Sequence, residues 1–583
     1  MYKPCLRAVS FLAVLYFCFP TVKPASGQGF QPTSPEKESI RGTVVNSVTH
    51  EAIGRALVFS PDNRFATMTD SEGHFEFTFS TPSTTQEGTG TESVVRINPA
   101  PDLPDTLMAR KPGFLDDRNT RVSTRSAAGK DLTISLTPEA LIVGHVLLPS
   151  SDDSDRIEVE LYRRQVREGR AHWISTGMAT SRSNGEFRFA DLSAGNYKVL
   201  TRELLDRDPL TFDPRGPLYG YPPVYFPNAA SFASAETIQL SPGETFHANI
   251  TVVRHAYYQV KVGAAGAEPG VGMNVTVYAE GRGPGYALGY NNQEQAIMGM
   301  LPDGNYTVEA ATYGPNPTTG LLNFSVKGAA VEGPGMILVH NGSVGVNVRE
   351  EFTQGEATGP QSIGLIKFSG GGSGLPQGPR RYLNIYLEPA DDFSIEQGAS
   401  LRGPSGPEDE SLVIDNVRPG RYWVRINSSR GFAASVTCGG IDLQRQPLVI
   451  GLGGSTSPIE VTMRDDGAEI EGTVEGMAKP VSEAGASQPQ TWLQPELQAH
   501  VYLVPAPDSS GEFREAWVSP EGKFTLQQVP PGVYRVLAFD RAQPELEYRN
   551  ADAMRAYESK GQAVSLVAGQ KQQLQLQMIS TSE

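Results

Sequence analysis

The chain has 583 residues, with 49 basic and 65 acidic side chains, a formal net charge of −16, and no block of lysine or arginine. An acidic chain without a basic stripe is a poor partner for nucleic acid or for anionic lipid, so the sequence predicts neither. Glycine (61 residues) and proline (44) exceed the average but stay below the level typical of disorder, which indicates a folded chain rich in turns.

Residues 1–27 have the pattern of a secretory signal peptide. Lys3 and Arg7 precede an apolar run at 8–19, and small residues follow at 25–27. The run is shorter than the roughly 20 apolar residues that a transmembrane helix needs. Phe17 stands before Cys18 where a lipoprotein signal has a small residue, so we expect no lipid anchor. We therefore expect a secreted, periplasmic or cell-envelope protein without a membrane span after cleavage.

Export leaves a single cysteine, Cys438, in the mature chain. No intrachain disulfide can form there, so each folded unit must be held together by its own apolar core. Cys438 alternates with Val436 and Ala434, which predicts a buried small apolar residue and not a reactive thiol.

Short runs of alternating apolar and polar residues predict β-strands along the whole mature chain. Such alternation places one face of a strand on a core and the other in water. Turn sequences such as Ser71-Glu72-Gly73 and Pro520-Glu521-Gly522 separate the runs, and many short strands with regular turns favour β-sandwiches. Clear examples of the alternation occur at 157–162, 275–278, 385–387 and 501–504.

One motif returns four times: an apolar residue, a short corner, then Gly-x-Tyr-x-Val. Its glycines are 109, 116 and 112 residues apart, which is one small domain per period. We expect the glycine to form a tight corner with positive φ, and Tyr and Val to face one core. The four copies begin at Gly195, Gly304, Gly420 and Gly532.

A fifth, N-terminal unit keeps the turn and strand at 70–77 but lacks the Gly-x-Tyr corner. The sequence thus predicts a tandem array of about five modules. We number them 1 to 5 and place them at 28–138, 139–252 (with an insert rich in proline and aromatic residues), 253–342, 343–466 and 467–583.

Module 1 resembles the carboxypeptidase regulatory-like domain in its segments 41–45, 53–59, 69–77, 109–114 and 132–136. This resemblance implies a small seven-strand Greek-key sandwich of the transthyretin-like (prealbumin-like) type. The later modules resemble the same broad group, which includes starch-binding-like and Cna B-type domains, and modules 1, 2 and 5 match best. Segment 221–245 is similar to one in secreted proteins of soil bacteria. Arg55 departs from the family, which often has proline in that turn.

Domains of this group are accessory modules without catalytic residues, and the chain itself offers no catalytic motif. The eight histidines are scattered, and neither a nucleophile elbow nor a phosphate-binding loop is present. We therefore predict a non-enzymatic protein with no metal site and no cofactor.

The resemblance to starch-binding-like folds suggests carbohydrate as a ligand. Exposed aromatic rings would stack on sugars, whereas the alternative is that these rings cover the core or stiffen a loop. The candidate residues are Trp173, Trp517 and the cluster Tyr219, Tyr221, Tyr225 and Phe226.

The resemblance to Cna B-type domains suggests an intramolecular Lys–Asn isopeptide bond in module 3. Lys261, Glu309 and Asn341 occur in a suitable order along the chain, although these residue types are common.

We thus predict a secreted binding or scaffold protein with polysaccharide as its ligand. The alternative is a structural stalk or adhesin-like protein that engages an envelope protein through exposed strand edges. A third interpretation is an accessory subunit of a separate hydrolase or transporter.

Overall fold

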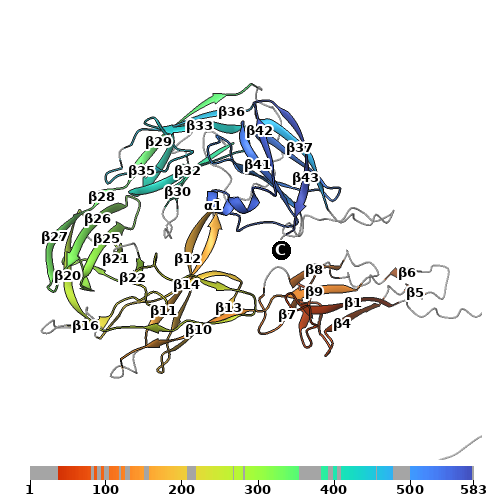
Figure 1. Cartoon of the computed structure of the whole chain (residues 1–583), viewed down its shortest axis with the longest axis horizontal. Coiled ribbons are helices and arrows are strands. Elements are labelled where there is room, and N and C mark those ends of the chain that lie inside the picture. The colour runs from red at the N-terminus through yellow and green to blue at the C-terminus, as the bar shows by residue number, and fades with distance from the viewer. Residues whose placement is uncertain are drawn as a thin grey trace, which may run out of the picture.

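The computed structural model describes residues 37–580 except 81–83, 88–93, 98–103, 105, 117–119, 125–130, 150–155, 207–217, 267, 269, 280–282, 354–381, 391–397, 404–408, 455 and 477–498. The predicted signal peptide lies outside the described residues. The chain is an all-β, multi-domain protein, as its sequence predicts (Figure 1). Each of the five predicted modules contains an apolar core of its own.

Modules 1 and 2 each consist of two sheets. Module 1 has the orders β4-β1-β9 and β3-β2-β7-β8 beside a β5-β6 hairpin, and module 2 has β13-β10-β18 and β12-β11-β14-β17. The strands of module 1 are β1 Lys37–Asn46, β2 Leu57–Phe59, β3 Ala66–Met68, β4 His74–Ser80, β5 Thr84–Glu87, β6 Val94–Ile97, β7 Thr106–Arg110, β8 Arg121–Ser123 and β9 Leu132–Leu136. Those of module 2 are β10 Ala140–Leu147, β11 Glu158–Arg167, β12 Arg170–Thr180, β13 Glu186–Leu192, β14 Gly195–Thr201, β15 Leu204–Leu205, β16 Leu218–Tyr221, β17 Ile238–Leu240, β18 Thr245–His247 and β19 Ile250–Thr251.

Modules 3 and 4 repeat the two-sheet arrangement. Their orders are β15-β16-β20-β24-β23 and β22-β21-β25-β26-β28 in module 3, and β31-β29-β36-β33-β34 and β30-β32-β35 in module 4. The strands of module 3 are β20 His255–Ala265, β21 Met273–Ala279, β22 Gly283–Tyr286, β23 Gly289–Asn291, β24 Ala296–Pro302, β25 Gly304–Thr312, β26 Thr318–Val326, β27 Val331–Ile337 and β28 Val339–His340. Those of module 4 are β29 Gly342–Glu351, β30 Leu383–Pro389, β31 Leu412–Val417, β32 Gly420–Ser428, β33 Phe432–Cys438, β34 Ile441–Asp442, β35 Leu448–Ile450 and β36 Ile459–Arg464.

Module 5 joins its strands into one curved sheet of order β39-β38-β41-β43-β37-β40, with β42 paired to β41. A short helical segment lies between β41 and β42. The elements are β37 Ala468–Glu475, β38 His500–Pro505, β39 Arg514–Trp517, β40 Lys523–Val529, β41 Gly532–Phe539, α1 Ala551–Met554, a 3-10 turn Arg555–Tyr557, β42 Gln562–Leu566 and β43 Lys571–Ile579.

The first strand of every module pairs in the same way. It runs antiparallel to one neighbour (β4, β13, β24, β31 or β40) and parallel to a strand late in the module. The parallel pairs are β1–β9, β10–β18, β20–β27, β29–β36 and β37–β43. All five modules thus share the pairing of their first strand.

The Gly-x-Tyr-x-Val motif forms a tyrosine corner in all four copies. Each tyrosine is buried and donates its hydroxyl hydrogen bond to the carbonyl oxygen four residues earlier, and the valine faces the same core. The bonds run from Tyr197 to Ser193 (2.7 Å), Tyr306 to Pro302 (2.9 Å), Tyr422 to Arg418 (2.9 Å) and Tyr534 to Pro530 (2.6 Å).

The role expected for the motif glycine needs correction. Only Gly195 has a positive φ, of 152°. At Gly304 and Gly420 a Cβ would come within 2.9 and 3.3 Å of the corner tyrosine's ring or hydroxyl. In these two copies a side chain at the glycine would meet the tyrosine, whereas at Gly532 it would meet Ser509 and Gly511.

Modules 1, 2 and 5 share a second feature. A glycine on the first strand faces a phenylalanine on the antiparallel neighbour, in the pairs Gly42–Phe75, Gly144–Phe187 and Gly472–Phe524. A Cβ at each glycine would lie 2.6–2.7 Å from the ring, so the ring occupies the space above the glycine. Modules 3 and 4 have Ala296 and Val413 in place of the phenylalanine.

The insert of module 2 joins module 3. Strand β16 pairs with β20, the first strand of module 3, so Tyr219 lies opposite Ala256. The predicted boundary at 252–253 therefore separates the two cores but not the sheets.

Modules 2 to 5 curve into a ring, and module 1 projects from it (Figure 1). The long β11–β12 hairpin of module 2 extends into the ring and ends beside α1 of module 5 (Figure 1). The hairpin thus connects the two ends of the arc.

Candidate functional site at the junction of three modules

Most of the aromatic cluster predicted to bind sugar is buried. Tyr221, Tyr225 and Phe226 are 1, 2 and 7% exposed, so the prediction that their ring faces are open to a ligand is wrong. The Tyr225 hydroxyl donates to the carbonyl of Pro284 in module 3 (2.8 Å). Tyr221 and Phe226 therefore belong to the core of module 2, and Tyr225 packs the joint with module 3, as the alternative interpretation of the insert proposed.

The other three candidates do not form one site. Trp173 packs edge-on against Phe232 with ring centroids 5.7 Å apart, and Tyr219 is 40% exposed with the Arg254 guanidinium 4.9 Å from its ring centroid. Trp517 is 59% exposed but lies on β39 of module 5.

A buried lysine anchors the outer layer of module 2. Lys198 is 6% exposed, donates to the carbonyl of Phe232 (2.7 Å), and lies over the rings of Trp173 and Phe232. Burial lowers the pKa of Lys198. Lys198 and Trp173 thus fasten the insert to its sheet.

The three isopeptide candidates make other contacts. Lys261 Nζ pairs with Glu294 at 2.5 Å, and its side chain is 41% exposed. Asn341 accepts a hydrogen bond from Thr319 (2.7 Å) and donates to the carbonyl of Asn416 (3.4 Å). Glu309 lies on β25, in the sheet opposite that of Lys261. The printed contacts bring none of the three together, and the isopeptide bond stays a prediction.

A polar junction forms where the β11–β12 hairpin meets module 5. Arg164 pairs with Glu547 at 2.5 Å, with side chains 30 and 12% exposed. The backbone N–H of Arg549 donates to the Gly169 carbonyl (3.1 Å), and Arg549 Nε donates to that of Glu168 (3.0 Å). Two segments about 380 positions apart in the chain are thus joined through both backbone and side chains.

Gly169 permits this close contact. It has φ of +70°, and a Cβ there would lie 2.7 Å from the ring of Tyr548. Tyr548 in turn stacks on Phe513 at a centroid distance of 3.8 Å and donates to Glu168 (3.3 Å). The hairpin tip therefore rests on an aromatic pair fixed to module 5.

Module 4 completes the junction from β32. The Arg170 guanidinium lies 4.0 Å from the centroid of the Trp423 ring, and Arg425 pairs with Glu388 at 2.6 Å. Burial, together with repulsion from Arg549 and Arg425, lowers the pKa of Arg170 to about 10. We define the junction by Arg164, Glu168, Gly169, Arg170, Trp423, Arg425, Glu547, Tyr548 and Arg549.

The sequence prediction missed these residues. Two signals point to them: several arginines surround the Glu168-Gly169 turn, and the stretch at 540–561 breaks the strand alternation between β41 and β42. Neither feature of the sequence predicts which residues of the other module each side chain contacts.

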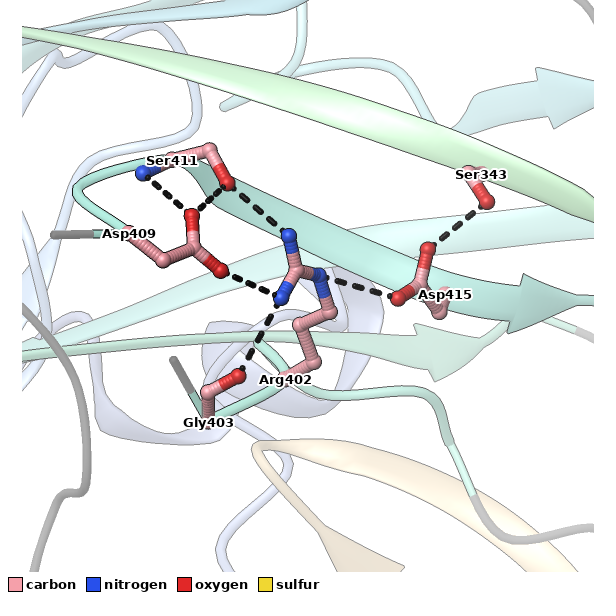
Figure 2. A network of polar contacts seen from close by, with 6 residues as sticks. All are labelled: Ser343, Arg402, Gly403, Asp409, Ser411 and Asp415. Carbon is pink, nitrogen blue, oxygen red and sulfur yellow. Dashed lines mark hydrogen bonds and ion pairs between the residues drawn. The ribbon is translucent and has the colours of Figure 1, made fainter. Parts of the chain in front are cut away.

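Another polar network, in module 4, is satisfied internally (Figure 2). All three nitrogens of the Arg402 guanidinium are used: by Asp409 (2.7 Å), by Ser411 (2.9 Å) and by Asp415 (3.1 Å). Ser343 donates to Asp415 (2.7 Å). The network fastens β31 and the residues directly before it to Arg402 and Ser343.

A groove of about 400 Å³ crosses module 1, lined by residues including Arg41, Asp70, His74 and Glu76. Arg41 and Glu76 pair with each other at 2.8 Å. Among the described residues no group of three or more His, Cys, Asp or Glu side chains is placed to hold a metal ion. Nor does the described part of the chain contain a helix long and apolar enough to cross a membrane.

Comparison with known proteins gives no family assignment. No protein-family model and no curated protein matches the chain. Among solved structures, it is similar to the Bacillus anthracis TIE protein (12% identity, TM-score 0.14, covering 73% of this chain and 69% of that one). It is also similar to the pilus adhesin SpaC of Lactobacillus rhamnosus GG (11% identity, TM-score 0.16, covering 52% of this chain and 43% of that one). A streptococcal ancillary pilin is similar at 12% identity and a TM-score of 0.17, covering 56% of this chain and 99% of that one. TM-scores this low carry no argument about function.

Proposed function

We propose that this chain is a non-enzymatic scaffold of the cell exterior or envelope that engages an envelope protein. Its modules, with the boundaries 28–138, 139–252, 253–342, 343–466 and 467–583, act as one rigid body and not as a flexible stalk. The observation that carries the proposal is the junction, because the contact of the hairpin with module 5 fixes the ring. A fixed ring presents surfaces from several modules at constant spacing, which lowers the entropic cost of binding a partner.

Strand β39 is the surface that best fits such a partner. It ends the sheet of module 5 among the described strands and carries the exposed Trp517. Edge strands offer backbone groups to an added strand, and exposed tryptophan is a frequent anchor of protein interfaces. Polysaccharide binding has less support, because three of the six candidate rings are buried and the others are dispersed.

The test is retention on the purified mature protein, offered solubilised envelope proteins in parallel with a panel of insoluble polysaccharides. We expect a specific envelope protein to be retained, and Trp517→Ala to weaken retention about tenfold, as expected for an interface anchor. Tyr313→Ala is the matched control, since Tyr313 is equally exposed (62%) but lies in module 3. Retention on a polysaccharide without any envelope protein would overturn the proposal.

A further inference from the structure

Two arginines at the junction have a carboxylate nearby, Glu388 for Arg170 and Glu168 for Arg549, but form no ion pair with the residues that the structure describes. Arg170 forms no ion pair with any residue that the structure describes, and its buried Nε has no hydrogen-bond partner there. Arg549 donates to a backbone carbonyl and likewise has no ion pair within the described residues. By contrast, Arg164 and Arg425 are paired, with Glu547 and Glu388.

The Arg170 side chain is partly removed from water, whereas Arg549 is exposed. A guanidinium that loses hydration without gaining an anion is destabilised, and neighbouring like charges increase the cost. The lowered pKa of Arg170 has these causes, burial first and then repulsion from Arg549 and Arg425, and it is opposed by Glu388 and Tyr548. The four arginines of the junction, Arg164, Arg170, Arg425 and Arg549, face three carboxylates, those of Glu168, Glu388 and Glu547, so one positive charge remains.

We propose that this junction is a binding site for an oxyanion, a carboxylate, sulfate or phosphate group held between Arg170 and Arg549. Guanidinium groups bind such anions through paired, charge-assisted hydrogen bonds. The ring of Trp423 fixes the position of Arg170 by stacking under it. The inference goes beyond the proposed function, which requires no ligand at this place.

The bound anion would also strengthen the ring. Arg170 comes from the hairpin of module 2 and Arg549 from module 5, so one ligand would bridge these two modules, while Trp423 of module 4 stacks on Arg170. The source of the oxyanion is either a free ion or an acidic group on a polymer, such as a uronic acid.

The experiment is calorimetric titration of the full mature chain with sodium sulfate, sodium phosphate, glucuronate and a short glucuronate oligomer, at constant ionic strength set with sodium chloride. We expect saturable binding of at least one probe. Arg170→Gln should weaken it by about tenfold or more, the effect of losing a charge-assisted contact. Arg188→Gln, which removes the same charge from an exposed position on β13, should change it less than about twofold.

The outcomes decide the proposal. Tighter binding of the oligomer than of the monomer assigns the site to an acidic polymer, and equal binding assigns it to a free ion. The absence of saturable binding by every probe, or unchanged binding by Arg170→Gln, would overturn the site.

A second measurement covers the case in which Arg170→Gln disturbs the hairpin. Wild-type crystals soaked in selenate should give an anomalous peak between Arg170 and Arg549. Peaks confined to other places would overturn the proposal.

Discussion

At the scale of single residues, the same hydrogen bond recurs in modules 2 to 5. Each corner tyrosine has a buried ring and bonds the carbonyl four residues earlier. The bond closes the corner that leads into a central strand, and it gives the carbonyl oxygen at that corner a hydrogen-bond partner. This explains why Gly and Tyr keep a fixed spacing while the residues between them vary.

We predict that Tyr534→Phe will destabilise the corner of module 5 by about 1 kcal/mol, because the carbonyl of Pro530 loses its buried partner. Hydrogen–deuterium exchange of the peptide around β41 should then be about fivefold faster. Tyr313→Phe, at an exposed ring, should leave exchange unchanged. If exchange in Tyr534→Phe equals that of the wild type, the hydrogen bond makes no net contribution to the stability of the corner.

Glu203 is a second residue with a defined effect, at the joint of modules 2 and 3. Its Oε1 accepts from the Ala287 N–H (2.7 Å), and its buried Oε2 has no partner among the described residues. Burial raises the pKa of Glu203 to about 8, opposed by the Ala287 N–H and by Arg202. The other titratable groups facing it are Tyr257, Tyr286 and Tyr306.

We therefore predict that the joint loses stability as pH rises. Between the ordinary pKa near 4.5 and about 8, the unfolded chain has released the proton of Glu203 while the folded chain keeps it. The stabilising contribution of Glu203 to the free energy of unfolding is complete below pH 4.5 and is lost once the pH exceeds about 8. Thermal unfolding followed from pH 4.5 to 8.5 should show the decline, and Glu203→Gln should flatten it. An identical slope in the variant would contradict the assignment.

At the scale of elements, the β11–β12 hairpin is longer than its own sheet requires. Strands β11 and β12 pair from Glu158–Thr180 to Arg167–Arg170. The next strand, β14, pairs with β11 only as far as Arg163, so it flanks only the base of the hairpin. The outer half has no core of its own and is held by Tyr548, Arg549 and Trp423. Docking therefore stabilises this half of the hairpin.

Gly169→Ala should release the hairpin tip. The new Cβ would meet the Tyr548 ring and would also strain a backbone at φ +70°. We expect faster hydrogen exchange in the segment 545–550. Gly270→Ala is the matched control, because Gly270 has φ +84° but no atom within 4 Å of the added Cβ. If both variants leave exchange at 545–550 equal, the contact does not hold the segment.

At the scale of the whole molecule, ring closure depends on a contact between distant parts of the chain. The ion pair of Arg164 and Glu547 is largely shielded from solvent, so breaking one partner leaves an uncompensated charge. Loss of this contact frees the hairpin end of module 2 from module 5 while each module keeps its own core.

A charge exchange tests this closure. Arg164→Glu and Glu547→Arg should each increase the radius of gyration measured by small-angle X-ray scattering, because like charges then meet. The double variant should restore most of the wild-type value, which is the signature of a direct pairwise interaction. An unchanged radius in both single variants would mean that the ring is held without this ion pair.

The sequence alone determined the local part of this structure. Strand alternation, turn residues and the Gly-x-Tyr-x-Val repeat predict an all-β chain of repeated units, because burial on one face and corner geometry are encoded over a few residues. The burial of Cys438 (6% exposed) follows from the same alternation. Arg55 has a left-handed φ of 56°, which proline cannot adopt, and this is a physical reason why proline does not stand in that turn.

Only the tertiary structure decided which side chains remain exposed and which modules meet. Tyr221 and Tyr225 resemble a sugar-binding platform in sequence but are buried, Tyr221 in the core of module 2 and Tyr225 at its joint with module 3, and Arg170 and Arg549 become neighbours only when the ring closes. Contacts between residues hundreds of positions apart leave no local pattern, because their energy depends on how whole modules pack and not on the residues beside them in the chain.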